Sequence, residues 1–366
     1  MTLHAPPHRQ DVVREFRARL TPHLAHLAKQ SDAVRRQFVP DVRELDNAHL
    51  IPDPFESGRD YMGLNGVERI YRDRVVLTPH FDCSAYCRYC FKKTRTLGGS
   101  GERDMSEADI DAAIAHIRTQ PELRIALITG GDPLRDEAKL FSLLDGLATI
   151  PHIAEIRIGT RNLLFEPDRL TDALAERIAS RSRIDCDDLA ASQAVMVGLS
   201  INHPDELSGA VARAVRRLVS RGVVVKGQVT LLREVNDDAA TLLALYQRFN
   251  ALGIQPYYLF HCMPVLGSAH FRTSVARGQQ ILGELAALSG VYAPTYVYVT
   301  QVGKVRVGID SPLDMVEIDG QAHLRKQTVY HAADFLRYTG RTDIPKPHYA
   351  DNEGRLVSLY PDGPAS

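Results

Sequence analysis

Six short apolar runs alternate with amphipathic stretches along the middle of the chain, and this alternation limits the fold more than any other feature. The runs span 74–81, 124–131, 155–160, 195–202, 223–232 and 254–263. The stretches between them predict helices over 106–119, 137–148, 168–180, 205–221 and 237–252. Strands that alternate with helices are typical of a parallel α/β sheet. Because the unit recurs along the chain, we expect a partial or complete α/β barrel.

The segments on either side of these runs have a different pattern. Residues 10–48 predict helix broken by polar turns, and residues 181–194 predict an irregular insertion. After residue 275 we expect a helix, an extended stretch over 292–308 and then a polar tail. We therefore divide the chain into an N-terminal helical segment (1–60), a barrel core (61–275) and a C-terminal extension (276–366).

Polar and glycine-rich motifs follow the predicted strands. Three cysteines come after the first run, "TGGDP" ends the second and "GTR" ends the third. "NHPDE" and "LLREVND" end the next two. Active sites of such folds lie at the carboxyl ends of the strands. The motifs are therefore expected to meet at one face of the barrel.

Composition excludes several classes of protein. The 366 residues are 44% hydrophobic and 24% charged, with a formal net charge of −1. This balance gives no electrostatic reason to expect nucleic acid or an anionic membrane as a partner. No apolar stretch approaches the length of about 18 residues that a membrane span needs, and the first residues lack the apolar core of a signal peptide. We expect a cytoplasmic protein, where clustered cysteines point to metal binding or catalysis.

Three of the five cysteines, Cys83, Cys87 and Cys90, lie in "HFDCSAYCRYCFKK" (80–93). Thiolates bind zinc or iron–sulfur clusters. A structural zinc ion needs four ligands, and His80 could be the fourth. Alternatively, three thiolates suit a 4Fe–4S cluster whose fourth iron stays open to a small molecule. A third interpretation, three buried apolar cysteines, is disfavoured by the polar flanking residues and the tight spacing.

The cysteine spacing resembles the CxxxCxxC signature of radical S-adenosylmethionine (SAM) enzymes. "TGGDPL" (129–134) resembles the GGD segment at the end of their second strand. In that superfamily the open iron chelates the amino and carboxylate groups of SAM. An electron then cleaves SAM to a 5′-deoxyadenosyl radical. The resemblance therefore implies a 4Fe–4S cluster, SAM and an electron donor such as flavodoxin or ferredoxin.

A longer series of motifs resembles the lysine 2,3-aminomutase family over roughly residues 60 to 330. The motifs, in the family's order, are "YRDRV", "CSAYCRYCFKK", "TGGDPL", "IRIGTR", "NHPDE", "GQVTLLREVND", "PYYLFHC" and "GSAHFRT". The implied fold is a partial (β/α)6 radical SAM barrel. Members also use pyridoxal 5′-phosphate (PLP) and move an amino group from the α to the β carbon of an amino acid.

The resemblance assigns cluster and SAM roles to particular residues. Cys83, Cys87 and Cys90 match the cluster ligands. The turn that meets the SAM amino group matches Gly130, Gly131 and Asp132. Two further positions, near the SAM and cofactor pocket, match Arg161 and Gln228.

It also implies a PLP site. Tyr71 matches the aromatic residue beside the PLP ring, Arg74 matches the cation at its phosphate, and Lys304 matches the lysine that carries PLP. A second family arginine is replaced here by Ile70, with Arg72 close by. Lys304 lacks the family's longer glycine-rich run before the lysine.

Other departures concern the substrate. Two aspartates that hold the lysine ammonium in lysine-specific members fall on Met263 and Val299, and Lys92 replaces the arginine that binds the substrate carboxylate. Neither Met263 nor Val299 can pair with a cation. We therefore predict a substrate other than lysine, with His261 as a candidate polar contact. The zinc-binding cysteines of some members are missing, because no cysteine follows Cys262.

The sequence thus favours a PLP-dependent 2,3-aminomutase whose small-molecule substrate is an amino acid other than lysine. A homo-oligomer stays open as an option. One alternative is a radical SAM enzyme of the same family that catalyses a different or PLP-independent reaction. An alternative from another class is a non-catalytic metal-binding protein.

Overall fold

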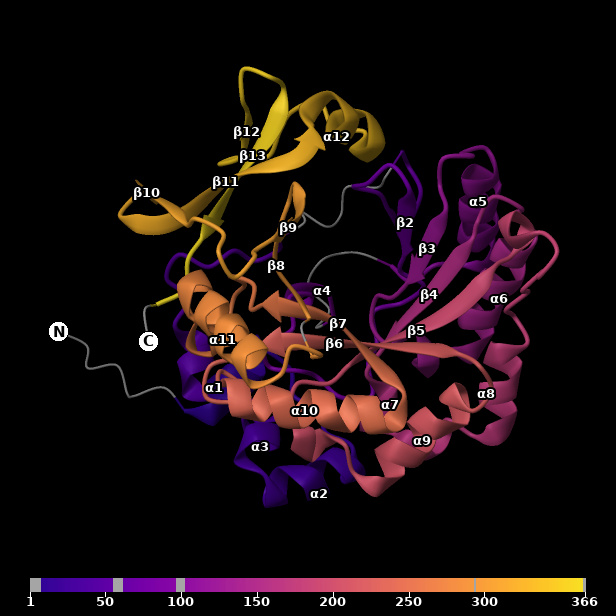
Figure 1. Ribbon diagram of the computed structural model, residues 1–366, viewed down its shortest axis with the longest axis horizontal. Helices are drawn as coiled ribbons and strands as arrows, with labels where there is room; N and C mark the ends of the chain where they lie inside the picture. Colours follow the sequence, from indigo (N-terminus) through magenta and orange to yellow (C-terminus); the bar gives the residue numbers. More distant parts are fainter. Residues whose placement is uncertain (1–7, 55–61, 97–102, 293, 365–366) are drawn as a thin grey trace.

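A nine-stranded sheet forms the centre of the protein, seen in a computed structural model that describes residues 8–54, 62–96, 103–292 and 294–364 (Figure 1). The strands lie in chain order across the sheet. They are β1 (Val67–Glu68), β2 (Arg74–Leu77), β3 (Ile125–Ile128), β4 (Glu155–Thr160), β5 (Ala194–Ser200), β6 (Val224–Leu231), β7 (Ile254–His261), β8 (Thr295–Thr300) and β9 (Gly303–Arg306).

Strands β2 to β8 pair in parallel, and β1 and β9 are antiparallel at the two edges. The sheet curls, and the helices cover its outer face (Figure 1). These helices are α5 (Glu107–Arg118), α6 (Glu137–Ala148), α7 (Asn162–Phe165), α8 (Asp172–Ala179), α9 (Gly209–Val219), α10 (Ala239–Leu252) and α11 (Val275–Leu288). The predicted partial (β/α)6 radical SAM barrel is confirmed, with β8 as an additional parallel strand.

Each strand separates an outer from an inner face. Along β6, Val225, Val229 and Leu231 are buried under the helices, whereas Lys226 and Gln228 are half-buried on the inner face. This alternation follows from the two-residue period of a strand. The inner face of the curled sheet is called the lumen below.

Helices α8 and α9 each begin four residues later than the sequence predicts. Helix α8 begins at Asp172 because Thr171 accepts a hydrogen bond from the Leu174 N–H and caps the helix. Helix α9 begins at Gly209, after the cap Ser208. In both cases a short 3₁₀ turn that starts with a proline precedes the cap. Among the helices that the structure describes, none is long and apolar enough to cross a membrane.

The N-terminal segment is helical and broken by turns, as predicted. It contains α1 (Arg9–Glu15), α2 (Pro22–Gln30), α3 (Asp32–Phe38) and the 3₁₀ turn η1 (Val42–Leu45). Leu24, Val34 and Phe38 are buried in the same core as the barrel. The Phe38 ring meets the Phe165 ring edge-on, with centroids 5.9 Å apart. This segment is therefore packed against the barrel.

The prediction of a polar tail is wrong. Residues 314–361 contain a separate four-stranded antiparallel sheet in the order β10–β11–β13–β12. Its elements are β10 (Asp314–Ile318), β11 (Gln321–His331), α12 (Ala332–Thr339), β12 (Tyr349–Ala350) and β13 (Arg355–Pro361). The sequence looks polar because many side chains of β10 to β12 are exposed, while Leu324, Leu356 and Tyr360 are buried. The predicted boundary at residue 275 stays a prediction, although the barrel sheet continues beyond it through β8 and β9.

Candidate active site

The three clustered cysteines lie in the loop that follows β2. Cys83, Cys87 and Cys90 are half-buried, unbridged thiols. Burial raises the pKa of Cys83, and the charges of Asp132, Cys90 and Cys87 raise it further. Burial, with Cys87, raises the pKa of Cys90 to about 11. The thiols are therefore close enough to repel one another as thiolates, and a positively charged iron cluster would offset that repulsion.

The zinc alternative has no geometric support in the described ranges. There, no group of three or more His, Cys, Asp or Glu side chains could hold a single metal ion. The His80 ring nitrogens have no hydrogen-bond partner among the residues that the structure describes, and the charged neighbours of His80 include Asp104 and Asp136. A 4Fe–4S cluster distributes its thiolates over separate irons. The loop therefore fits a cluster better than one ion.

The GGD turn is joined to the cysteine loop backbone to backbone. Gly131 N–H donates to the carbonyl of His80 at 2.8 Å, and Asp132 N–H donates to the carbonyl of Asp82 at 2.9 Å. A Cβ on Gly131 would lie only 2.1 Å from that Asp82 oxygen. Gly130 has a φ of +127°, which favours glycine. Glycine is therefore required for the two loops to approach this closely.

The Asp132 carboxylate links the ends of two strands. It accepts hydrogen bonds from Thr160 Oγ1 and the Arg161 backbone N–H, both at 2.7 Å. It also accepts one from the Leu134 N–H at 3.2 Å. Burial raises the pKa of Asp132, and these hydrogen bonds oppose the shift. The side chain thus fixes the top of β3 against β4 beside the cysteine loop.

Arg161 brings the end of β4 to the cluster thiols. Its Nη1 donates to Cys87 Sγ at 3.2 Å and to the Tyr89 hydroxyl, and its Nη2 donates to Glu206 at 2.9 Å. Although burial opposes the shift, Cys87, Tyr89 and Glu206 raise the pKa of Arg161. The guanidinium therefore lies directly against the Cys87 sulfur. Sequence reasoning did not single out Tyr89 or Glu206; the position of "NHPDE" at a strand end was the available signal.

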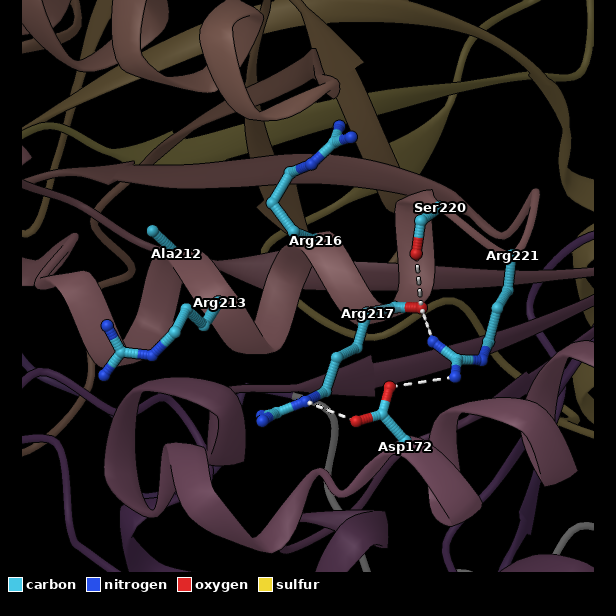
Figure 2. A pocket seen from close by; sticks show the side chains of 7 residues that line it. All are labelled: Asp172, Ala212, Arg213, Arg216, Arg217, Ser220 and Arg221. Carbon is cyan, nitrogen blue, oxygen red and sulfur yellow. Dashed lines mark hydrogen bonds and ion pairs between the residues drawn. The ribbon is translucent and has the colours of Figure 1, made fainter.

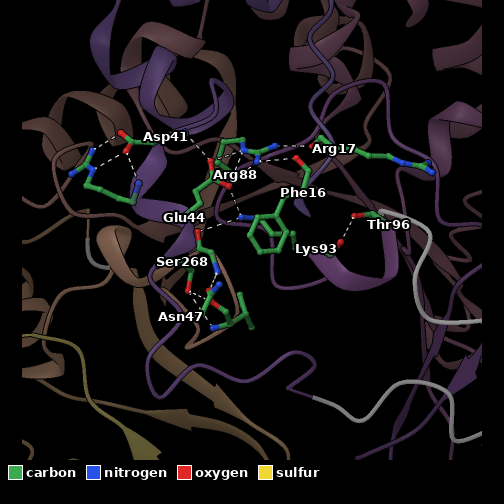
Figure 3. Close-up of polar contacts among 12 residues, drawn as sticks. Phe16, Arg17, Asp41, Glu44, Asn47, Arg88, Lys93, Thr96 and Ser268 are labelled. Carbon is green, nitrogen blue, oxygen red and sulfur yellow. Dashed lines mark hydrogen bonds and ion pairs between the residues drawn. The ribbon is translucent and has the colours of Figure 1, made fainter. Parts of the chain in front are cut away.

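The N-terminal segment holds the cysteine loop through buried charges (Figure 3). Glu44 pairs with Arg88 at 2.7 Å and with Lys93 at 2.9 Å. Arg88 also donates to the carbonyls of Phe16 and Arg17. The three charged side chains are at most 3% exposed. Since buried charges must be paired, Glu44 fixes the loop on both sides of Cys90. Sequence reasoning missed this contact.

Lys304, on β9, lies among aromatic rings in the lumen. Its Nζ is 4.8 Å from the ring centroid of Tyr258 and 5.6 Å from that of Phe260. Burial lowers the pKa of Lys304 to about 8, and the positive charges of Arg74 and Arg157 act in the same direction. The amine is therefore partly neutral near physiological pH, as a nucleophile toward an aldehyde must be.

Tyr71 and Arg74 lie beside Lys304. The Tyr71 hydroxyl accepts a hydrogen bond from the Lys304 backbone N–H at 2.8 Å. The Arg74 guanidinium lies 4.5 Å from the centroid of the Tyr71 ring and pairs with Asp73 at 3.0 Å. The three residues that the resemblance assigned to PLP thus come together. An aromatic ring, an amine and a cation fit the ring, aldehyde and phosphate of PLP.

The chain belongs to a known family, as its similarity to other proteins shows. The model of the Radical SAM superfamily matches residues 77–245. The chain is 33% identical over 366 residues to the L-lysine 2,3-aminomutase of Acetoanaerobium sticklandii (strain ATCC 12662 / DSM 519 / JCM 1433 / CCUG 9281 / NCIMB 10654 / HF), covering 95% of this chain and 85% of that protein. This chain is a member of the lysine 2,3-aminomutase family of radical SAM enzymes.

Two other relatives agree. The L-lysine 2,3-aminomutase of Clostridium subterminale is 33% identical over 291 residues, which covers 78% of this chain and 67% of the relative. The glutamate 2,3-aminomutase of Clostridioides difficile (strain 630) is 31% identical over 294 residues, with 79% and 66% covered. The chain is therefore an isomerase of the radical SAM aminomutase type, in a family whose members act on more than one amino acid.

The aminomutase carries a buried cation, Lys92, close to its cysteines. Lys92 is 7% exposed, and within the described residues its Nζ has no hydrogen-bond partner. Burial lowers the pKa of Lys92, whereas Glu68 opposes the shift. A buried ammonium in these surroundings suits an anionic ligand such as a carboxylate.

Val299 and Met263, which the resemblance places at the far end of the substrate, differ in how deeply they are buried. Val299 lies directly opposite Lys304 in the β8–β9 ladder and is half-buried, and Met263 is buried just after β7. His261 is not available: its ring nitrogens contact the Tyr360 hydroxyl and the Thr273 carbonyl, both at 2.9 Å. The expectation that His261 could contact substrate is therefore wrong, because Tyr360 of β13 occupies one nitrogen and the Thr273 carbonyl occupies the other.

A pocket rich in arginine lies outside this site (Figure 2). Arg213, Arg216, Arg217 and Arg221 line it together with Asp172. Asp172 pairs with Arg221 at 2.8 Å and with Arg217 at 3.4 Å. The pocket runs along α9 and beside the start of α8, in the layer of helices rather than in the lumen. Basic side chains there also complement the dipole of α9.

Proposed function

We propose that this aminomutase uses PLP and moves the α-amino group of an amino acid other than lysine to the neighbouring carbon. The observation that carries the proposal is the position of Lys304. Its amine is buried, its pKa is lowered to about 8, and its backbone is bonded to Tyr71. A lysine of this kind is suited to hold an aldehyde cofactor.

The chain's own residues would then divide the work. When bound, a 4Fe–4S cluster with SAM supplies a carbon-centred radical from one electron delivered by a donor protein, and PLP supplies a conjugated ring that takes up the substrate's amino group. Cys83, Cys87 and Cys90 would hold the cluster, and Gly130 and Gly131 would leave backbone groups free for SAM. Arg161 would hold the Cys87 side chain in place through its Nη1 contact with the sulfur.

The substrate would be oriented from the lumen wall. Lys92 would bind its carboxylate, since the buried ammonium has no other hydrogen-bond partner among the described residues. Gln228, on the inner face of β6, would contact SAM or PLP. Met263 and Val299 would contact the far end of the side chain. An ammonium there would lose water without gaining an ion pair, so an apolar or weakly polar side chain is favoured.

The test is anaerobic incubation of the reconstituted enzyme with SAM, a reductant and a panel of amino acids, followed by mass spectrometry of the products. The expected product has the mass of its substrate and carries nitrogen on the β carbon. The Lys304→Ala variant should lose this product and the visible absorption of lysine-bound PLP, whereas Lys29→Ala, at an exposed helix position, should retain both.

One observation favours a second candidate. Ile70 occupies the place of a second arginine and packs with Val302, Phe335 and Leu356 rather than facing the lumen. A radical SAM reaction without PLP would leave no use for that cation. Radical-dependent turnover in an enzyme that never binds PLP would establish this candidate and refute the PLP-dependent one.

A further inference from the structure

The lumen holds a lysine that neither the cluster nor the carboxylate site uses. Lys226 lies half-buried on the inner face of β6. Its Nζ is 5.0 Å from the centroid of the Tyr257 ring. Within the described part of the chain, no carboxylate lies at ion-pair distance from it. An unpaired ammonium facing a lumen is a position where an anion is favoured.

A second cation lies on the other side of the same tyrosine. Arg157, on the inner face of β4, donates to the Tyr257 hydroxyl at 3.1 Å, and its guanidinium is 5.5 Å from the ring centroid. It also contacts Glu155, which balances part of its charge. Lys226 and Arg157 therefore flank Tyr257 with net positive charge.

The wall beside Lys226 carries glycines at its own level. In the sheet register Lys226 pairs with Gly198 of β5, and Gly198 pairs with Gly159 of β4. Part of the space beside Gly198 is taken by the Gln228 amide, whose Nε2 lies 2.8 Å from the place where a Cβ would stand. A ligand group that reaches the ammonium from β5 would therefore also meet Gln228, a polar side chain on the same face of β6.

The surroundings of Lys226 and Lys304 meet at a pair of tyrosine rings. The centroids of the Tyr257 and Tyr258 rings are 4.0 Å apart, and the Lys304 Nζ is 4.8 Å from the Tyr258 centroid. After burial, Arg157 lowers the pKa of both lysines, and Arg74 lowers the pKa of Lys304. A dianion placed near Arg157 would relieve the repulsion that it exerts on both lysines.

The segment before Tyr71 adds no further cation. Arg69 is bound to Glu122 at 3.0 Å and to backbone carbonyls, the Arg72 side chain is exposed, and Ile70 packs in an apolar cluster. Arg74 already shares its charge with Asp73. A phosphate monoester carries a charge of about −1.5 to −2 at neutral pH. Arg74 by itself therefore leaves much of this charge unmatched.

We propose that Lys226, assisted by Arg157, binds the phosphate of PLP from the β4–β6 wall of the lumen. This inference rests on the proposed use of PLP and adds the residues that hold its charged end. PLP carries its aldehyde and its phosphate on one rigid ring. With the aldehyde held at Lys304, Lys226 and Arg157 would supply positive charge for the phosphate in addition to Arg74.

The experiment compares two ligands that differ only in the phosphate. Dissociation constants for PLP and for pyridoxal are measured by absorption titration of the full-length enzyme and its variants. Lys226→Gln should raise the Kd for PLP about tenfold or more, because a charge-assisted contact is lost, and should change the Kd for pyridoxal less than about twofold. Lys226→Arg should restore most of the PLP affinity, and Lys29→Gln should change neither constant.

The neutral variants are expected to fold. Removing an unpaired charge relieves repulsion with Arg157 and leaves no buried partner behind. Lys226→Met provides a second neutral variant. Equal losses of PLP and pyridoxal affinity, or no loss of either, would overturn the role of Lys226. If the unmodified enzyme bound neither ligand at Lys304, the proposed use of PLP would fail first, so the two failures are distinguishable.

Discussion

The backbone N–H of Lys304 donates a 2.8 Å hydrogen bond to the hydroxyl of Tyr71, across 233 positions of the chain. Tyr71 precedes β2 at one side of the sheet, whereas Lys304 lies on β9 at the other. The bond therefore joins the two sides of the curled sheet around the lumen. It holds the candidate PLP lysine beside the aromatic residue expected to contact the PLP ring.

Uptake of PLP should depend on pH through Lys304. The pKa of this lysine is lowered from its usual value of 10.5 to about 8. Only the neutral amine attacks an aldehyde, so the uptake rate should rise about tenfold per pH unit below the pKa and level off above it. Stopped-flow absorption from pH 6 to pH 10 measures this. A midpoint near 10.5 would contradict the buried environment.

Each cluster cysteine should be essential for SAM cleavage. Cys83→Ala, Cys87→Ala and Cys90→Ala remove one thiolate from a site with three. Each should abolish formation of 5′-deoxyadenosine and lower the iron content after anaerobic reconstitution. Cys186→Ala is the matched control, since Cys186 is exposed in the irregular insertion. Full SAM cleavage in any of the first three variants would refute the cluster assignment.

A methyl group on Gly131 should separate the GGD turn from the cysteine loop. The new Cβ would lie 2.1 Å from the backbone oxygen of Asp82, which cannot move without displacing the loop. We expect overpacking of about 1–3 kcal/mol and SAM affinity weakened by roughly tenfold or more. Gly290→Ala, with no atom within 4 Å of the added carbon, should have neither effect. Unchanged SAM binding in Gly131→Ala would contradict the close approach of the loops.

Loss of the Glu44 charge should destabilise the protein and its cluster loop together. Glu44→Gln leaves Arg88 and Lys93 buried without a carboxylate, a cost of about 3–5 kcal/mol. Chemical denaturation measures the loss, and iron retention reports the loop. Glu317→Gln on the exposed face of β10 is the control, with an expected change within about 0.5 kcal/mol. A stability loss with unaltered iron retention would separate Glu44 from the cluster loop.

Lysine should be a poor substrate. Met263 and Val299 offer no carboxylate to its ammonium, and the uncompensated desolvation should lower kcat/KM at least about tenfold relative to the best neutral amino acid. The double change Met263→Asp with Val299→Asp should improve lysine binding, while the uncharged pair Met263→Asn with Val299→Asn should not. Equal turnover of lysine and neutral substrates by the unmodified enzyme would refute the prediction.

The sequence predicted the order of strands and helices because that information is local. The burial of β6 alternates from one residue to the next. The helix caps Thr171 and Ser208 each bond to an N–H group only three residues further along the chain. The cysteine motif and the GGD turn could also be recognised in the sequence, because each is contained in one short contiguous segment. The resemblance could place Lys304, Tyr71 and Arg74 only as separate positions.

The C-terminal sheet escaped prediction for a physical reason. Its strands bury only part of their side chains, so their composition resembles that of a polar tail. In addition, β11 pairs with β13, whose residues are far from those of β11 in the sequence. Lys226 was missed because its significance depends on its neighbours. A lysine in a strand is ordinary until Gly159, Gly198 and Arg157 are known to surround it.

The sequence by itself determined the barrel, the cysteine motif and the family, since these depend on periodicity and on short, contiguous motifs. Only the tertiary structure decided which charges are paired. The pairs Glu44 with Arg88 and Arg161 with Glu206 are set by long-range packing. The same packing leaves Lys92 and Lys226 without a carboxylate partner among the described residues. Packing also removed His261 from the list of candidate substrate contacts. Burial makes each of these differences large, because a charge taken out of water needs a partner that no local pattern specifies.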